Sequence, residues 1–205
     1  MLNHIRLTDF RNYVSCRIDF HSGMNCFMGR NGQGKTNLLE AVYYLSLVRS
    51  FRTTRLADLI AWKRDGFVLS GQARDADGQA VDLAVAQGVE RKLLVNHQPV
   101  YRASDFINQF ICVTFIPQDL ELIQGEALLR RRFMDIAISQ SSPEYLRHLQ
   151  AYGNALKSRN AMLRNPDKYP RAMITAYDQQ MIREGVAVEL ARKEFSREVN
   201  QSLQE

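Results

Sequence analysis

The stretch that most restricts the fold of this chain is Gly29-Arg30-Asn31-Gly32-Gln33-Gly34-Lys35-Thr36. Its spacing, Gly-x-x-x-x-Gly-Lys-Thr, is typical of a phosphate-binding loop that joins a strand to a helix. Glycines let the backbone wrap around phosphates where side chains would clash, and the N–H groups of such a loop point inward. The sequence therefore predicts a strand before the loop and a helix after it, with phosphates bound at the junction.

The residues on both sides of the loop agree with this prediction. Residues 24–28 form a short apolar run, which predicts a buried strand. From residue 36 to residue 47, apolar side chains recur at helical spacing, which predicts a helix packed on one face. The start of that helix adds a partial positive charge beside the loop. A chance glycine-rich turn is the less favoured interpretation, because the loop stands between the two required elements.

We expect the ligand to be ATP with Mg²⁺. Lys35 is expected to reach the β- and γ-phosphates, and the hydroxyl group of Thr36 is expected to hold Mg²⁺. The loop alone does not say how ATP is used, since kinases, transporters, helicases and chromosome-maintenance ATPases share it. The predicted nucleotide-binding residues are Gly29, Arg30, Asn31, Gly32, Gln33, Gly34, Lys35, Thr36 and Asn37.

The rest of the first half reads as strands. Residues 2–9 and 16–20 alternate between apolar and polar side chains, and residues 9–13 form a turn between them. Short alternating runs between residues 66 and 100 predict an antiparallel meander, with turns at Asp77-Gly78, Gln87-Gly88 and Asn96-His97. Residues 110–116 are predicted to form another buried strand, which Pro117 ends.

After Pro117 the pattern becomes helical. The stretch Ser141-Ser-Pro-Glu144 predicts a helix start with a capping box, and residues 165–167 break that helix. A second long helix is predicted from about Pro170, so the two form an antiparallel pair or a coiled-coil arm. The predicted domains are an α/β head over residues 1–117 and a helical lobe over residues 118–205.

Composition narrows the class of protein. With 45% hydrophobic and 24% charged residues, the chain has the make-up of an ordinary soluble globular protein. The net charge of +5 permits an anionic partner such as nucleic acid. No signal peptide is evident, and residues 110–116 are too short an apolar run to span a bilayer. The three cysteines have neither the spacing of a disulfide framework nor that of a metal site, so we expect a cytoplasmic protein. We expect no membrane among its partners.

Several stretches together resemble the RecF family of recombination-mediator ATPases, which is related to the SMC and ABC-type ATPases. They are Leu-Thr-Asp-Phe-Arg-Asn-Tyr at residues 7–13, the loop itself, and Arg-Ser-Phe-Arg-Thr at residues 49–53. Residues 117–125, 130–135 and 156–164 are also similar to the family. The chain departs from the family pattern near Ala127, at Met134 and at Tyr177, where the family often has proline, leucine and tryptophan.

The resemblance implies an α/β fold: a P-loop ABC-type ATPase head with an antiparallel β-meander and an inserted all-helical lobe. It implies a DNA replication and repair protein that forms an ATP-dependent homodimer on DNA at single-strand gaps. Such a protein helps to load the recombinase and to induce the SOS response, with RecO and RecR as partners. Its expected reaction is slow, DNA-dependent ATP hydrolysis.

Two motifs that the resemblance requires are absent from these 205 residues. One is a Walker B strand ending in Asp-Glu, and the other is a serine-rich signature motif. Asp119 is rejected as the Walker B acid because Pro117-Gln118 separates it from the apolar run and no second acid follows. Gln118 is either a glutamine-loop ligand of Mg²⁺ or a turn residue without that role. We therefore assign no catalytic residue, and we expect a truncated chain that is inactive alone.

Two clusters of basic residues are candidate contacts to DNA. Arg49, Arg52 and Arg55 follow the first helix and are candidates for contacts to DNA or to the nucleotide. The run at residues 130–132 either binds DNA phosphates or forms a solvated or ion-paired helix face, with Glu126 and Asp135 nearby at helical spacing, and the second interpretation is favoured. Two other functions stay open. The first, a small nucleotide or metabolite kinase, is disfavoured by the meander and the long helix pair. The second is a docking module that binds ATP without catalysis.

Overall fold

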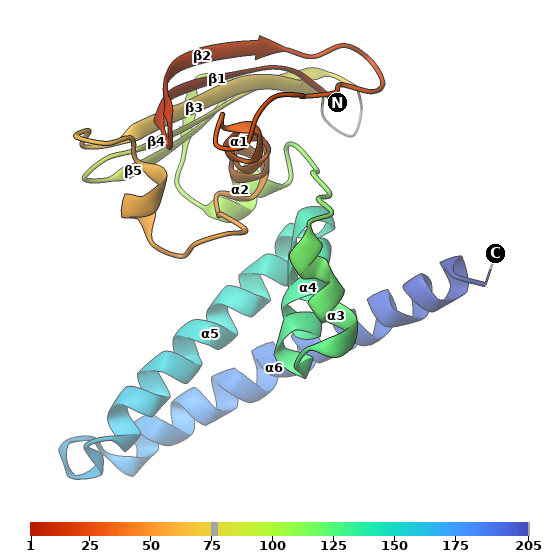
Figure 1. Cartoon of the computed structure of the whole chain (residues 1–205). Coiled ribbons are helices and arrows are strands. Elements are labelled where there is room, and N and C mark those ends of the chain that lie inside the picture. Colours follow the sequence, from red (N-terminus) through yellow and green to blue (C-terminus); the bar gives the residue numbers. More distant parts are fainter. Residues whose placement is uncertain (75–77, 205) are drawn as a thin grey trace. The chain divides into compact units, whose positions relative to one another are not determined.

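The computed structural model describes residues 1–74 and 78–204, which fall into two compact units (Figure 1). The first unit comprises Met1–Phe115 and the second Ile116–Glu205. Each unit has its own core. No helix in the described part of the chain is long and apolar enough to cross a membrane.

The first unit is built on a six-stranded sheet in which every neighbouring pair is antiparallel. The spatial order is β2-β1-β3-β4-β5-β6. The predicted strands at residues 2–9 and 16–20 and the predicted meander are thereby confirmed, although Asp77 of the expected Asp77-Gly78 turn lies outside the described residues. The strands are β1 (Leu2–Phe10), β2 (Tyr13–Asp19), β3 (Phe67–Arg74), β4 (Ala80–Gln87), β5 (Arg91–Val95) and β6 (Gln98–Val100).

Helices α1 (Lys35–Leu47) and α2 (Ala103–Ile107) lie against one face of this sheet, and a 3-10 turn, η1 (Leu56–Leu59), follows α1 along the chain (Figure 1). The prediction of a helix over residues 36–47 is confirmed by α1. The aromatic rings of Phe10, Tyr44 and Phe67 pack together with centroids 5.1 to 6.4 Å apart. Gly71 of β3 has no room for a side chain, because a Cβ atom there would lie 2.5 Å from a backbone oxygen of β1 and 3.0 Å from Leu45 Cδ2 in α1.

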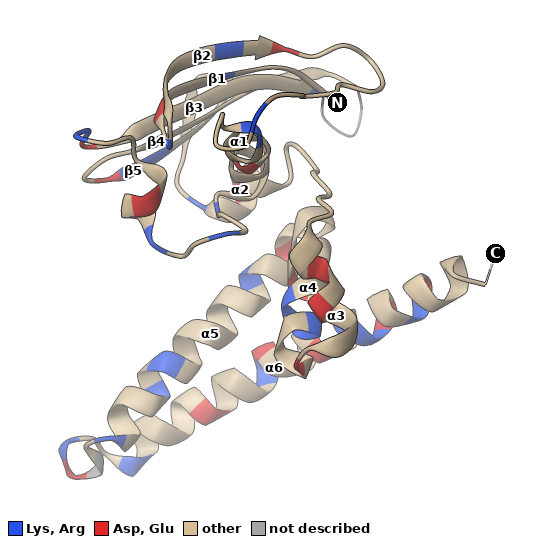
Figure 2. Cartoon of the chain, in the orientation of Figure 1, with Lys and Arg blue, Asp and Glu red and all other residues tan. Residues whose placement is uncertain are grey.

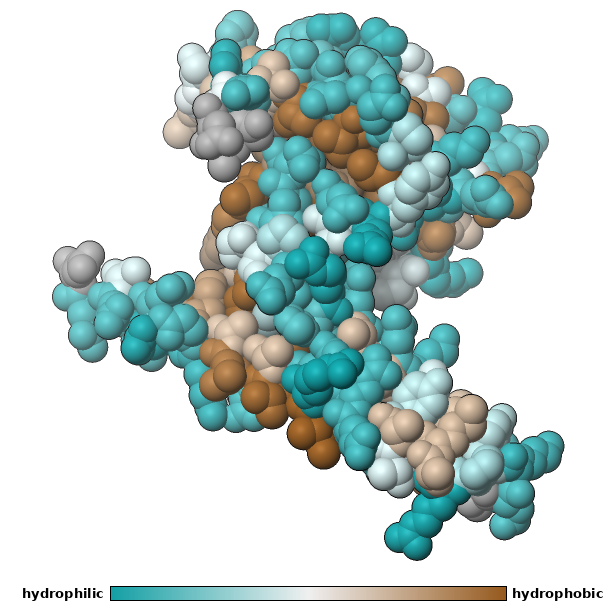
Figure 3. Space-filling view, turned by 180° about the vertical axis from the view of Figure 1, so that it is seen from behind, coloured by the Kyte–Doolittle hydropathy of each residue, from teal (hydrophilic) through white to brown (hydrophobic). Residues whose placement is uncertain are grey.

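The prediction of buried strands at residues 24–28 and 110–116 is wrong. Neither segment forms a strand. The side chains of the first segment are mostly exposed, with Met28 at 92% of full exposure, and in the second segment exposed side chains such as Val113, at 87%, alternate with buried or half-buried ones. A strand needs a neighbour for its backbone groups, and the six strands of the sheet pair with one another instead. Both segments therefore add to the hydrophobic surface of the unit; brown patches of such surface are visible in Figure 3.

The second unit is helical. Its elements are η2 (Pro117–Leu120), α3 (Glu121–Gln124), α4 (Ala127–Ser141), α5 (Pro143–Leu163), η3 (Pro166–Lys168) and α6 (Arg171–Ser202). Helices α5 and α6 form the predicted antiparallel pair, which is confirmed by side-chain contacts of His148 with Glu184 and of Arg159 with Asp178. The residue that caps α5 is Ser142, whose hydroxyl oxygen accepts the backbone N–H of Tyr145 at 3.1 Å, so the helix begins one residue later than expected.

The core of the helical unit joins α4, α5 and α6. Ile138, Tyr145 and Val188 are buried together. Beside them, Asp135 accepts two hydrogen bonds from the guanidinium group of Arg192, at 2.8 and 2.9 Å. The carboxylate of Asp135 therefore ties α4 to α6 across the core. The interpretation of the run at residues 130–132 as a solvated or ion-paired helix face stays a prediction.

Candidate phosphate-binding site

The glycine-rich loop has the backbone that its sequence requires. Gly29, Gly32 and Gly34 have φ angles of +152°, +81° and +103°, in the region that side chains disfavour. Gly34 has a second constraint, since a Cβ atom there would lie 2.8 Å from the Nδ2 atom of Asn12. The loop therefore depends on glycine at Gly34 both for its backbone angle and for the close contact with the turn after β1.

The loop folds around the side chain of Lys35, the first residue of α1. The Nζ atom donates hydrogen bonds to the carbonyl oxygens of Gly29, at 2.7 Å, and Arg30, at 2.8 Å. Thr36 is exposed beside it, and the first turn of α1 contains no acidic residue. An ammonium group, a hydroxyl group and the positive end of a helix thus meet at one place, which fits an anionic phosphate chain with a bound cation.

A turn between β1 and β2 supports the loop from the side. Arg11 adopts a left-handed conformation with φ of +56°, which turns the chain back on itself. The hydroxyl group of Tyr13 donates to the carbonyl oxygen of Gly34 at 3.3 Å, and the Nδ2 atom of Asn12 donates to that of Gln33 at 3.4 Å. Burial raises the pKa of Tyr13, so this hydroxyl group keeps its proton for the contact. The turn is thereby fastened to the loop backbone at two adjacent residues.

Behind the loop lies a buried carboxylate, that of Glu40 in α1, whose side chain has no exposed surface. Arg11 binds it in a bidentate manner, with Nη2–Oε1 and Nε–Oε2 distances of 2.7 and 2.8 Å. The hydroxyl group of Ser50 also donates to Oε1, and Nη1 of Arg52 donates to Oε2 at 3.4 Å. The stretches at residues 7–13 and 49–53, far apart from each other in sequence, thus meet on one carboxylate.

Sequence reasoning missed Glu40, Asn12 and Tyr13 as parts of this site. A signal for Glu40 was present, since Lys35 and Glu40 are the sole charged residues of α1 in the sequence, and most of the helix is buried. A carboxylate in such a helix requires cationic partners. Nothing in the spacing of Asn12 and Tyr13 shows that their side chains reach the loop.

The three arginines predicted to bind DNA have different surroundings. Arg52 donates to Asn37 Oδ1 at 2.7 Å and so belongs to the site just described. Arg55 is 80% exposed and lies 4.0 Å from Asp58, and Arg49 has an interaction partner within the chain. A further basic group, formed by Arg164, Lys168 and Arg171, lies at the turn between α5 and α6 (Figure 2). That Arg49, Arg52 and Arg55 contact DNA stays a prediction.

The remaining predicted ligand, Gln118, is exposed in η2 and belongs to the helical unit. Its role with Mg²⁺ stays a prediction. The neighbouring Asp119 accepts the backbone N–H of Ile116 at 2.8 Å, so this acid caps the start of η2. Within residues 1–74 and 78–204, no group of three or more histidine, cysteine or acidic residues is arranged to hold a metal ion.

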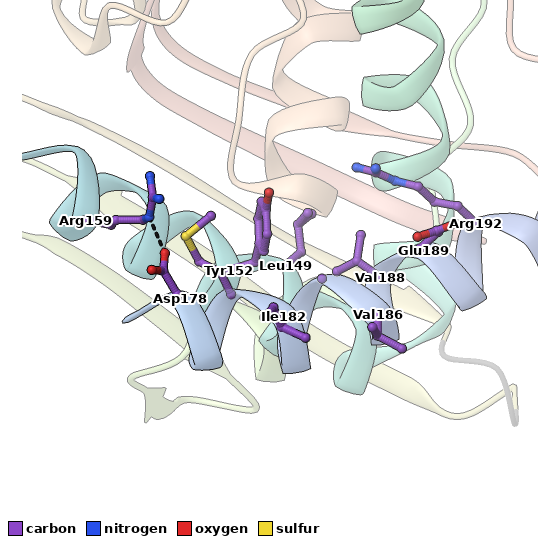
Figure 4. Close-up of a pocket in the computed structure, with 11 residues that line it drawn as sticks. Leu149, Tyr152, Arg159, Asp178, Ile182, Val186, Val188, Glu189 and Arg192 are labelled. Carbon is purple, nitrogen blue, oxygen red and sulfur yellow. Dashed lines mark hydrogen bonds and ion pairs between the residues drawn. The ribbon is translucent and has the colours of Figure 1, made fainter. Parts of the chain in front are cut away.

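The helical unit contains a surface groove of about 910 Å³ between α5 and α6 (Figure 4). Leu149, Tyr152 and Ile182 give it apolar walls, and the ion pair of Arg159 with Asp178 lies at one end. The groove holds no glycine-rich turn or paired lysine and threonine of the kind found at the loop. The phosphate-binding features of the chain therefore belong to the first unit.

The comparisons with known proteins show which family this chain is similar to. Residues 1–74 match the family model described as the RecF/RecN/SMC N terminal domain. The DNA replication and repair protein RecF of Streptococcus gordonii is 37% identical over 205 residues, which are 100% of this chain and 56% of the relative. RecF of Lactococcus lactis subsp. lactis is 38% identical over 196 residues, which are 95% of this chain and 54% of the relative.

Solved structures give the same result. A structure described as the recombination mediator protein RecF-ATPrS in the RecFOR pathway has a TM-score of 0.89 and 27% identity, over 96% of this chain and 54% of that chain. A second, described as RecF-ATP, has the same TM-score and 28% identity. The fold is that of a P-loop ABC-type ATPase head with a helical lobe. The chain spans about half the length of the curated relatives it matches, and over that portion it is similar to the RecF family.

Proposed function

We propose that this chain binds ATP with Mg²⁺ at residues 29–37, as the nucleotide-binding part of a RecF-type DNA replication and repair protein. The observation that carries the proposal is the loop of left-handed glycines closed around the ammonium group of Lys35. Relatives whose descriptions name ATP share this fold over almost the whole chain. Lys35 would bind the β- and γ-phosphates, and the hydroxyl group of Thr36 would hold Mg²⁺.

The use of ATP is proposed from the family. The full-length protein would close into a homodimer on DNA at single-strand gaps when ATP is bound, and it would act in the cytoplasm with RecR and RecO to load the recombinase. Arg55 is the most available of the three predicted DNA contacts, because its side chain is 80% exposed and its ion pair with Asp58 is long, with 4.0 Å between Nε and Oδ1. An arginine that contacts a phosphate contributes about one unit to the slope of affinity against salt. Replacing the residue that corresponds to Arg55 by alanine in a full-length relative should therefore lower that slope.

ATP binding is tested by titrating a fluorescent ATP analogue into the wild-type chain, Lys35→Ala and Lys92→Ala. Lys92 is an exposed lysine of β5 in the same unit and away from the loop, so it is the matched control. Loss of a charged hydrogen-bond donor predicts that Lys35→Ala binds roughly 10- to 100-fold more weakly, while Lys92→Ala binds like the wild type. Equal affinity of Lys35→Ala and wild type would contradict the proposal.

The magnesium role is tested in the same assay, with and without Mg²⁺. We expect Mg²⁺ to strengthen binding by the wild type and by Thr36→Ser, which keeps the hydroxyl group. Thr36→Ala should lose most of that gain, because its side chain offers no oxygen ligand. If Thr36→Ala responds to Mg²⁺ as the wild type does, the cation is held elsewhere.

Binding and turnover are separable in this chain. These 205 residues contain no Asp-Glu pair after an apolar strand, so no acid is assigned to position the attacking water. We propose that the chain binds ATP and leaves it intact, a result that phosphate-release measurements can check. Steady hydrolysis of ATP, after subtraction of the rate of Lys35→Ala, would show that an acid among these residues positions the attacking water.

A further inference from the structure

We propose that Glu40 is a positioning residue for the phosphate-binding loop. Its carboxylate holds Arg52, from which a relay of side-chain hydrogen bonds runs through Asn37 and Asn12 to the backbone of Gln33. The inference rests on the proposed function in that ATP affinity is one of its two readouts. It assigns to Glu40 no contact with the nucleotide.

The relay starts from a carboxylate whose acceptor sites are filled. Both oxygens of Glu40 accept from Arg11, and each also accepts from one residue of the segment after α1: Oε1 from Ser50 and Oε2 from Arg52. A buried carboxylate is costly unless it is paired and hydrogen-bonded in this way. Since its partners come from two separate segments, Glu40 fixes the place of both relative to α1.

From Arg52 the contacts run in one direction to the loop. Arg52 Nη1 donates to Asn37 Oδ1 at 2.7 Å, and Asn37 Nδ2 donates to Asn12 Oδ1 at 2.8 Å. Asn12 Nδ2 then donates to the Gln33 carbonyl oxygen. Each amide accepts on its oxygen and donates from its nitrogen, so each bond polarises the next one. A guanidinium group held by Glu40 thereby supports the backbone of the residue before Gly34.

The direction of the change in ATP affinity in one variant distinguishes positioning of the loop from a simple effect of charge. Glu40→Gln removes a negative charge from the helix that follows the phosphate-binding loop, so the loss of Coulomb repulsion alone predicts tighter binding of the anionic ATP. It also places an amide N–H against the donors of Arg11, which breaks the bidentate contact and releases the relay. If Glu40 positions the loop, affinity falls by roughly tenfold in spite of the lost charge.

The experiment measures ATP affinity for the wild type, Glu40→Gln, Asn12→Ala and the double variant. Asn12 is exposed, so its replacement tests the relay in a folded protein even if Glu40→Gln lowers stability. We expect both single variants to bind more weakly, and the double variant to bind no more weakly than the weaker single variant, because both act through one relay. Glu184→Gln is the matched control, since it neutralises a buried carboxylate in the helical unit and should leave affinity unchanged.

The second readout is amide hydrogen exchange of residues 29–36 without nucleotide. Both relay variants should exchange faster there, and Glu184→Gln should not. Unchanged exchange and unchanged affinity in Asn12→Ala would overturn the proposal, as would tighter ATP binding by Glu40→Gln. A wild-type chain that does not bind ATP would instead contradict the proposed function, while the exchange measurement would still decide the role of Glu40.

Discussion

The ammonium nitrogen of Lys35 lies 2.7 Å from the carbonyl oxygen of Gly29, so the loop is closed on itself by the residue that ends it. An ammonium group has three donors, and the contacts to Gly29 and Arg30 use two of them. One donor is therefore left for a phosphate oxygen while the loop stays closed. The planar guanidinium of an arginine has a different shape and reach, so Lys35→Arg is not a conservative change here.

Gly34→Ala is predicted to weaken ATP binding. Alanine disfavours the φ angle of +103°, and its Cβ atom would displace the side chain of Asn12, for a combined cost on the order of 1–3 kcal/mol. Gly88→Ala is the matched control, because a Cβ atom there meets no atom within 4 Å. Titration and thermal unfolding of both variants check this, and equal behaviour of the two would show that the left-handed turn is dispensable.

Asp135→Asn is predicted to destabilise the helical unit. It weakens the bidentate contact with Arg192, and the side chains of the pair are only 20% and 25% exposed, so the loss should be about 1–3 kcal/mol in urea unfolding. The comparison is Glu189→Gln, which removes an exposed pair with Lys193 and should cost at most about 0.5 kcal/mol. Similar losses in both variants would mean that burial of the first pair adds nothing.

The stability of the helix pair is predicted to fall on acidification. The hydrogen bond from His148, followed by that from Arg183, lowers the pKa of Glu184 below its ordinary value of 4.5. A carboxyl group with a lowered pKa stabilises the folded state above its unfolded pKa, and this contribution is lost as the pH falls through the folded value. Glu144, 3.7 Å from the other ring nitrogen of His148, faces the same group.

Urea unfolding from about pH 6 to about pH 3 measures this loss. In Glu184→Gln, which has no carboxyl group to protonate, the free energy of unfolding should change less over the same range. If the two curves run parallel, the pKa of Glu184 is not lowered by folding.

Two of the three thiols, those of Cys26 and Cys112, are predicted to react at different rates. Burial raises the pKa of Cys112 to about 11, so very little thiolate is present near neutral pH. Cys26 is exposed and open to the reagent. Alkylation with iodoacetamide, followed by mass spectrometry, should therefore modify Cys26 well before Cys112. In denaturant the two should react alike, and equal rates in the folded chain would contradict the burial of Cys112.

Local patterns predicted the elements in which apolar side chains recur on one face. The alternation of β3 and β4 and the apolar spacing of α1 both report which face is buried, even though β3 pairs with the distant β1 as well as with β4. Residues 24–28 and 110–116 have equally apolar patterns, but apolarity states only that a segment can be buried. Whether it pairs depends on a neighbouring strand, which no local pattern contains.

The candidate site shows the same division. The residues of the loop were predictable because phosphate binding demands glycines, a lysine and a hydroxyl group at fixed spacing. The relay from Glu40 to Gln33 was not, because it is assembled from segments about ten to thirty residues apart whose side chains have no common spacing. Asp135 illustrates the same limit, since helical spacing pointed to arginines of its own helix and the structure pairs it with Arg192 in α6.

The single residue between α4 and α5 affects how the helical unit can move. Ser142 ends one helix and caps the next, and Pro143 directly after it restricts the backbone. Beyond Ser142, no linker residue separates the two helices at this corner. We therefore expect a rotation of α5 to move α4 with it, and the ion pair of Asp135 with Arg192 ties α4 to α6 beside the corner.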